Sequence, residues 1–140
     1  MTKEGKITVE KKMKKGIKKL LAEAGKVITT ILVAEAQDLL GSNDHTFVDL
    51  RDFRELKREG KAPGTFSCPR GMLEFWVDPE SPYHKDIFSE DKTFVLYCAS
   101  SWRSALAAKT LAEMGLKSVV HFKGGFKKWK DDGAPVEDVS

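Results

Sequence analysis

Short apolar and β-branched runs recur along the chain, separated by segments with the spacing of amphipathic helices. The clearest run is residues 93–97, Thr-Phe-Val-Leu-Tyr, which lacks polar alternation and therefore predicts a strand buried on both faces of a parallel sheet. Four further runs rich in Val, Ile, Thr and Phe predict shorter strands. The five predicted strands are residues 27–30, 46–50, 65–67, 93–97 and 118–122.

Helical spacing occurs between these strands and before the first of them. Apolar residues occupy one face of residues 9–24, lysines occupy the opposite face, and Gly25 marks the end. Gly16 weakens this predicted helix without abolishing it. Residues 69–88 are irregular, with one or two amphipathic turns. The other predicted helices are residues 33–40, 52–59 (capped by Asp52), 104–114 and 126–131.

This alternation predicts the fold class. Strands separated by helices indicate an α/β protein, here a three-layer sandwich with a mostly parallel five-stranded central sheet flanked by helices. With 140 residues, 41% of them hydrophobic, the chain can bury one core. We expect a basic amphipathic helical extension over residues 1–26 and a single domain over residues 27–140.

Charge is distributed unevenly. Residues 1–26 hold nine lysines and three glutamates, whereas the rest of the chain is mildly acidic, and the net charge is +3. A basic segment of this kind can contact nucleic acid or anionic lipid. No arginine or aromatic residue interleaves the lysines, so we favour a solvated helix face and expect no specific nucleic-acid partner.

Composition also bears on the compartment. Apolar stretches stay well short of the roughly 20 residues that cross a bilayer, so no transmembrane segment is expected. The lysine-rich start lacks the apolar core of a secretory signal. Two cysteines are too few for a disulfide scaffold. We therefore expect a cytoplasmic location.

The candidate chemistry lies where the buried strand ends. Cys98 follows that strand, small residues come next, and a helix begins near Arg103. Ligands of open α/β sheets bind beyond the carboxyl ends of strands. A loop before a helix start supplies backbone N–H groups and positive potential, which favour a thiolate. A lone cysteine is more often a core residue, but the small polar residues and the arginine favour a nucleophile here.

Three segments resemble motifs of rhodanese-like domains, in the same order along the chain. V-D-L-R at 48–51, with P-G at 63–64, resembles the family's D-x-R … I-P-G-A region. C-x-x-x-x-R-S at 98–104 resembles its active-site loop. G-G-F-x-x-W-x-x-x-G-x-P at 124–135 resembles its C-terminal motif. The resemblance covers about residues 27–136.

The resemblance implies a sulfurtransferase with Cys98 as the catalytic nucleophile. A persulfide on Cys98 would take sulfane sulfur from a donor such as thiosulfate and pass it to a thiophilic acceptor, cyanide or a thiol, or to a protein acceptor. Asp49 and Arg51 either support the loop mouth or form a strand-end ion pair and helix cap. The residues expected to bind substrate are Ala99, Ser100, Ser101, Trp102, Arg103 and Ser104.

Three alternatives remain open from the sequence. A non-catalytic interaction module would keep the fold alone, and a persulfide carrier would use the same cysteine. Phosphatases and arsenate reductases of related architecture place the arginine six positions after the cysteine, whereas Arg103 comes five after Cys98. Phosphatases also commonly have histidine before the cysteine, where this chain has Tyr97. Both features favour sulfur chemistry.

The remaining candidates are weaker. The three histidines and two cysteines lack metal-ligand spacing, so neither a metal nor another cofactor is expected. Cys68 could resolve the persulfide into a disulfide with Cys98, but burial as a small side chain is the favoured interpretation.

Overall fold

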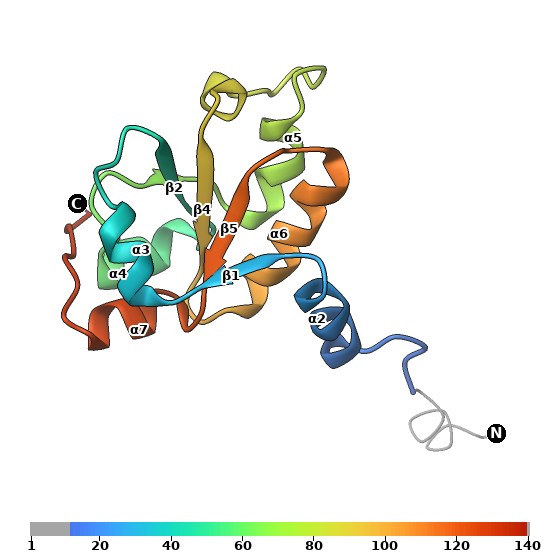
Figure 1. The fold of residues 1–140 in the computed structure, drawn as a ribbon, viewed down its shortest axis with the longest axis horizontal. Coiled ribbons are helices and arrows are strands. Elements are labelled where there is room, and N and C mark those ends of the chain that lie inside the picture. Colours follow the sequence, from blue (N-terminus) through green and yellow to red (C-terminus); the bar gives the residue numbers. More distant parts are fainter. Residues whose placement is uncertain (1–11, 140) are drawn as a thin grey trace.

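A computed structural model describes residues 12–139 and contains a five-stranded sheet. All strand pairs are parallel, in the order β1-β5-β4-β2-β3 (Figure 1). The predicted α/β class and five-stranded sheet are confirmed. The strands are β1 (Thr29–Ile31), β2 (His45–Asp49), β3 (Phe66–Ser67), β4 (Thr93–Tyr97) and β5 (Val119–Phe122).

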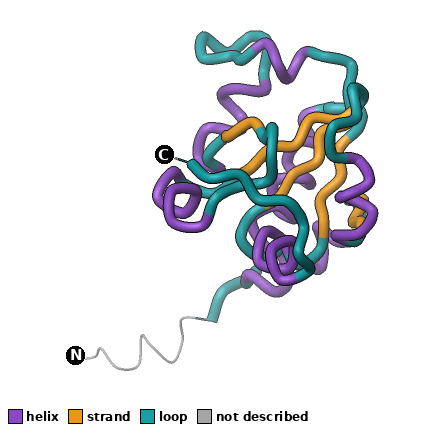
Figure 2. Tube along the Cα trace, turned by 90° about the vertical axis from the view of Figure 1, so that its left-hand side faces the viewer, coloured by secondary structure: helices purple, strands orange, loops and turns teal. Residues whose placement is uncertain are grey.

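Helices cover both faces of this sheet, and Figure 2 shows the layers from the side. Two short 3-10 helices, η1 (Arg70–Met72) and η2 (Asp86–Ser89), flank α5 (Leu73–Val77) in the region predicted to be irregular. The α-helices are α2 (Ile17–Gly25), α3 (Val33–Leu39), α4 (Phe53–Glu59), α5 (Leu73–Val77), α6 (Trp102–Met114) and α7 (Gly125–Asp131).

Strand β4 divides the core into two halves because its side chains alternate between the faces. Phe94 and Leu96 pack with residues of α5 and α6. Val95 and Tyr97 pack on the other face with residues of α3 and α7. Burial on both faces explains the uninterrupted apolar run of this strand.

The connection from β2 to α4 ends in a helix cap that the sequence predicts. Asp52 accepts hydrogen bonds from the backbone N–H groups of Arg54 and Glu55, at 2.8 and 3.2 Å. The Glu55 carboxylate in turn accepts the Asp52 N–H at 3.0 Å. This reciprocal capping box fixes the start of α4.

The predicted first helix is too long. Within the described residues, 12–15 are not helical and α2 begins at Ile17, with Gly16 in an extended conformation as its N-cap. Glycine is a poor helix former and readily leaves the helical region, which explains the boundary. Residues 1–11, where the prediction also placed the start of the extension, lie outside the described residues.

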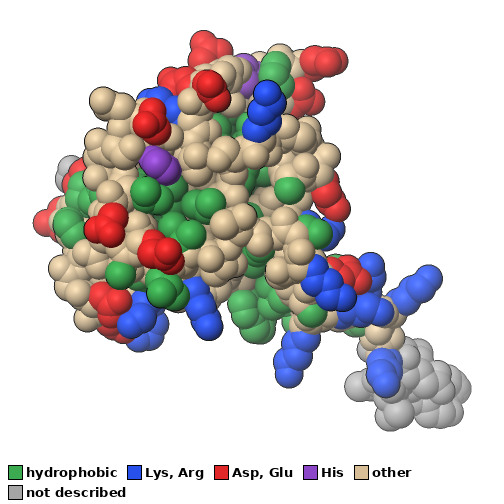
Figure 3. Space-filling view, in the orientation of Figure 1, with side chains coloured by type: hydrophobic (Ala, Val, Ile, Leu, Met, Phe, Trp, Pro, Cys, Tyr) green, Lys and Arg blue, Asp and Glu red, His purple; other side chains and the backbone are tan. Residues whose placement is uncertain are grey.

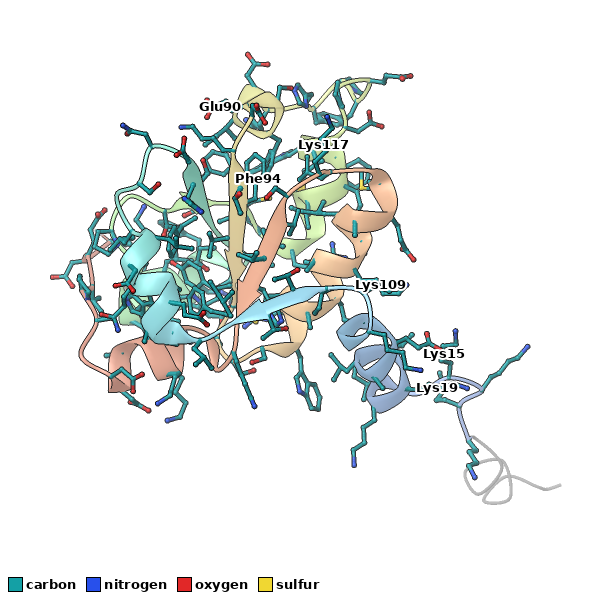
Figure 4. The ribbon with its side chains drawn as sticks, viewed as in Figure 1. Lys15, Lys19, Glu90, Phe94, Lys109 and Lys117 are labelled. Atoms are coloured by element: carbon teal, nitrogen blue, oxygen red, sulfur yellow. The ribbon has the colours of Figure 1, made fainter. Side chains whose placement is uncertain are left out.

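Helix α2 packs beside α6 (Figure 1). Ala24 is fully buried, whereas Ile17 and Leu20 remain exposed. Lysines gather over this part of the surface in Figure 3, and Figure 4 shows Lys15 and Lys19 extending from it. None of the helices in the described part is long and apolar enough to cross a membrane.

Candidate active site

The loop from Cys98 to Ser101 joins β4 to α6 at the carboxyl edge of the sheet (Figure 1). Cys98 directly follows Tyr97, the last residue of β4, and Ser101 is the N-cap of α6. Helix α6 begins at Trp102, two residues earlier than the sequence predicts. The positive end of the α6 dipole therefore lies at this loop.

The Cys98 sulfur is enclosed in this conformation. The residue is 1% exposed and packs with the core half that contains α5 and α6. Among the described residues, one backbone donor reaches the sulfur: Ser104 N–H, at 3.4 Å. This donor belongs to the third residue of α6 and not to the loop that precedes the helix.

The amides of residues 99–103 are nevertheless available. Within residues 12–139, none of these five N–H groups donates a hydrogen bond to another protein group. Unpaired N–H groups at a helix start are suited to bind an anion. The loop thus has the donors for an anionic ligand that the resting conformation does not use for Cys98.

The start of α7 forms hydrogen bonds with the loop that joins β4 to α6. Phe126 N–H donates to the Cys98 carbonyl at 2.8 Å, and Lys127 N–H to the Ala99 carbonyl at 3.1 Å. Gly124 N–H donates to the Ser101 hydroxyl oxygen at 2.8 Å. A Cβ at Gly125 would overlap the Ser100 carbonyl oxygen, so glycine is required for this close approach.

Arg103 is paired with Glu55 of α4, a residue that sequence reasoning missed. Two guanidinium nitrogens contact the two carboxylate oxygens at 2.9 Å each. Hydrogen bonding to Arg103 lowers the pKa of Glu55 to about 2, and the Glu55 carboxylate raises the pKa of Arg103. The Cys98 sulfur lies within electrostatic range of this guanidinium and contributes to the same rise.

Asp49 and Arg51 lie together inside the protein. Both side chains have no exposed surface, and the Arg51 Nη2 contacts Asp49 Oδ2 at 2.8 Å and the Gly60 carbonyl at 2.7 Å. The guanidinium also stacks over the Phe126 ring, 4.1 Å from its centroid. This buried ion pair links β2, the segment after α4 and the start of α7, and the helix cap is made by Asp52 instead.

The other loop side chains differ in exposure. Trp102 is 54% exposed and Ser100 is also exposed, so both face a ligand or partner approaching from solvent. Ala99 and Ser101 are half-buried. Ser104 is fully buried, and its hydroxyl contacts His121, a second residue that motif reasoning passed over.

Cys68 has the properties of a core thiol. It is fully buried at the end of β3, and burial raises its pKa to about 12. Its sulfur donates weakly to the Pro69 carbonyl at 3.8 Å. Both cysteines are free thiols in this structure.

Comparison with known proteins identifies the family. Residues 32–132 match the family model described as a rhodanese-like domain. The mouse thiosulfate sulfurtransferase/rhodanese-like domain-containing protein 3 is 30% identical over 100 residues, which are 68% of this chain and 64% of the mouse protein. The chain therefore spans less than two thirds of that relative.

Solved structures agree with this assignment. A Rhodopseudomonas palustris protein of unknown function, described as a possible tyrosine phosphatase, is 56% identical with a TM-score of 0.88, covering 91% of this chain and 98% of that one. The polysulfide-sulfur transferase homodimer of Wolinella succinogenes is 34% identical with a TM-score of 0.64, covering 86% and 85%. On these matches and on the motifs around Cys98, this chain belongs to the rhodanese-like domain family.

Proposed function

We propose that this chain is a sulfurtransferase that carries sulfane sulfur as a persulfide on Cys98. The observation that supports this most is the loop itself: Cys98 receives the Ser104 N–H, and the next five amides have no acceptor within the described chain. Such donors stabilise a thiolate and the terminal sulfur of a persulfide. The positive charge of Arg103 acts in the same direction.

The reaction has two displacements. In the first, the Cys98 thiolate attacks the outer sulfur of thiosulfate, a new S–S bond forms, and sulfite leaves with the electron pair of the broken bond. In the second, an acceptor such as cyanide attacks the terminal sulfur, a C–S bond forms to give thiocyanate, and the S–S bond breaks with its electron pair returning to Cys98 as the thiolate. Neither displacement requires a general base when the thiolate of Cys98 and the cyanide anion are the reacting species.

Loop length supports sulfur over phosphate. Arg103 follows Cys98 by five positions and is held by Glu55, so its two engaged nitrogens are not free to bind phosphoryl oxygens. A single sulfur atom needs less space than a tetrahedral phosphate. The similar Rhodopseudomonas protein is described as a possible phosphatase, so the two activities have to be measured side by side.

Access to the sulfur requires motion. Because Cys98 is almost completely enclosed, a donor reaches it only when loop residues move apart. The small side chains at positions 99–101 favour such opening because few contacts are lost. We therefore expect reaction of Cys98 to be slower than that of an exposed thiolate, yet measurable without unfolding.

The test is transfer of sulfur from thiosulfate to cyanide. Cys98→Ser is expected to lower the rate at least about 100-fold, since the nucleophile is lost. Cys68→Ala is the matched control and is expected to stay active. Mass spectrometry after thiosulfate treatment should find one added sulfur atom on the peptide with Cys98. Full activity of Cys98→Ser would contradict the proposal.

The same preparations separate the alternatives. Hydrolysis of an aryl phosphate or reduction of arsenate that depends on Cys98, with no sulfur transfer, would identify a phosphatase or reductase. A persulfide that forms but is not passed to small acceptors would identify a carrier for a protein acceptor. Absence of any persulfide would leave a non-catalytic interaction module.

A further inference from the structure

His121 is a buried histidine behind the active-site loop. It lies in β5, is 3% exposed, and is paired in register with Thr30 of β1 and Leu96 of β4. Its neighbour Phe122 packs on the α3 and α7 face, so alternation along the strand places His121 on the face of α6.

Both ring nitrogens of His121 have hydrogen-bond partners. Nδ1 lies 2.9 Å from the Ser104 hydroxyl oxygen, and Nε2 lies 2.9 Å from the Thr30 hydroxyl oxygen. The Ser104 hydroxyl donates its hydrogen to the Ser101 carbonyl at 3.1 Å. With this hydrogen on the Ser101 carbonyl, the Ser104 oxygen accepts from Nδ1–H of the imidazole, since a hydroxyl has one hydrogen to donate.

This assignment sets the direction of the whole chain of hydrogen bonds. With the hydrogen on Nδ1 of a neutral ring, Nε2 is an acceptor and the Thr30 hydroxyl donates to it. Burial lowers the pKa of His121, which favours that neutral form. The chain runs from Thr30 through His121 to Ser104 and ends on the Ser101 carbonyl.

Ser104 is also the residue whose N–H reaches the Cys98 sulfur, at 3.4 Å. Its hydroxyl is therefore held on one side by His121 and on the other by the N-cap of α6. A shift of Ser104 would turn its N–H away from the sulfur. The imidazole thus contacts the residue whose N–H reaches the Cys98 sulfur.

We propose that His121 is a positioning residue for sulfur chemistry, holding Ser104 so that its backbone N–H stabilises the anionic sulfur of Cys98. The proposal rests on the proposed sulfurtransferase function and adds to it a residue on β5. It predicts that the ionised fraction of the Cys98 thiol depends on whether the side chain at position 121 carries a hydrogen-bond donor.

Three substitutions test this dependence. His121→Phe removes the donor, and His121→Asn restores one, since an asparagine amide nitrogen takes nearly the place of Nδ1. His45→Asn is the matched control, because His45 makes a similar bond to Ser42 on a strand end remote from the loop. The readout is the ultraviolet absorbance of the Cys98 thiolate against pH, with Cys98→Ser subtracted.

We expect His121→Phe to lower the ionised fraction of Cys98 at neutral pH by about 3- to 10-fold, because the hydrogen bond from Ser104 N–H to the sulfur is weakened while its donor stays in place. His121→Asn should recover most of that loss, and His45→Asn should show none. An unchanged ionised fraction in His121→Phe, or an equal loss in His121→Asn, would overturn the proposal.

Ser104→Ala is a second variant that tests the proposal if His121→Phe does not fold. It removes the hydroxyl that His121 binds but keeps the N–H, so it should produce a loss similar to that of His121→Phe. In the Ser104→Ala background, His121→Asn should have no further effect. Thiolate formation does not require sulfur transfer, so the two proposals can fail separately. If the chain transfers no sulfur but the ionised fraction of Cys98 still changes with the residue at position 121, only the proposed sulfurtransferase function is disproved.

Discussion

Arg103 reaches from α6 to α4 and engages the Glu55 carboxylate with two nitrogens. The guanidinium is thereby fixed in place, and the Cys98 sulfur lies within electrostatic range of it. Glu55 also accepts the N–H of Asp52, so the same carboxylate caps α4 and orients Arg103. One residue thus couples helix formation to the electrostatics of the loop.

Glu55→Gln tests this coupling through the pH dependence of stability. The pKa of Glu55 is about 2 in the folded chain, below its value of roughly 4.3 in unfolded chains. The ionised form therefore contributes stability above the unfolded value, and that contribution is lost as pH falls towards 2.

We expect Glu55→Gln to lower the free energy of unfolding at pH 7 by about 1 kcal/mol and to lose less on acidification than the parent chain. Urea denaturation at pH 7 and pH 3 measures both effects. Glu113→Gln, which breaks an exposed pair with Lys109, is the control and should change little. Equal effects of the two substitutions would refute the coupling.

The two cysteines are expected to differ in reactivity. Burial raises the pKa of Cys68 to about 12, so its thiol stays protonated at pH 8. Mass-mapped alkylation of the native chain should label Cys98 slowly and leave Cys68 unlabelled until denaturant is added. Labelling of native Cys68, or a disulfide between the two after oxidation, would instead support a resolving role for Cys68.

At the scale of elements, the loop is shaped by α7 as much as by β4 and α6. Two N–H groups at the start of α7 donate to loop carbonyls, and Arg51 packs against Phe126 of the same helix. The turn into α7 uses Gly124 and Gly125, both with positive φ, at 89° and 60°. The turn therefore brings one backbone against another, which no side chain would allow.

Gly125→Ala is expected to disrupt this approach. Its Cβ would lie 2.6 Å from the Cys98 carbonyl oxygen and closer still to that of Ser100. We expect a loss of at least about 3 kcal/mol in the free energy of unfolding, from steric overlap added to backbone strain. Urea denaturation measures this loss, and the sulfur-transfer rate should fall with it.

Gly133→Ala is the matched control for backbone strain. Gly133 also has a positive φ, 76°, but nothing lies within 4 Å of its ideal Cβ. Its substitution should cost only about 1 kcal/mol. If both variants lost the same stability, the close contact at Gly125 would not matter.

At the scale of the whole molecule, α2 joins the domain by packing beside α6. Ala24 is buried beside α6, while the rest of the helix is largely exposed and lysine-rich. Lys18 and Lys19 of this helix are both exposed, so their charges lie on its solvent side. Whether α2 is part of the cooperative fold depends on how much stability the Ala24 contact contributes.

Ala24→Asp measures that contribution. A carboxylate forced into this contact without a partner should detach α2 and lower the free energy of unfolding by about 2 kcal/mol. Ala22→Asp places the same side chain on the exposed face of the same helix and should have little effect. Thermal unfolding and hydrogen exchange over Ile17–Gly25 report the outcome. Equal results for the two variants would show that α2 does not belong to the cooperative fold of the domain.

The sequence alone determined the order of strands and helices in the sandwich and the position of Cys98 after the central strand. Residues 93–97 form β4 and Asp52 caps α4 as predicted, because apolar periodicity and capping depend on residues adjacent in the chain. The same local logic explains the late start of the first helix, since Gly16 is a residue that a helix readily excludes.

Only the tertiary structure decided which distant residues meet. The strand order, the burial of Cys98 and the pairing of Arg103 with Glu55 come from the packing of helices on the sheet. The contact between His121 and Ser104 arises in the same way, because β5 lies beside β4 beneath α6. Such contacts leave no periodic signal in the sequence, since they join residues that belong to separate patterns.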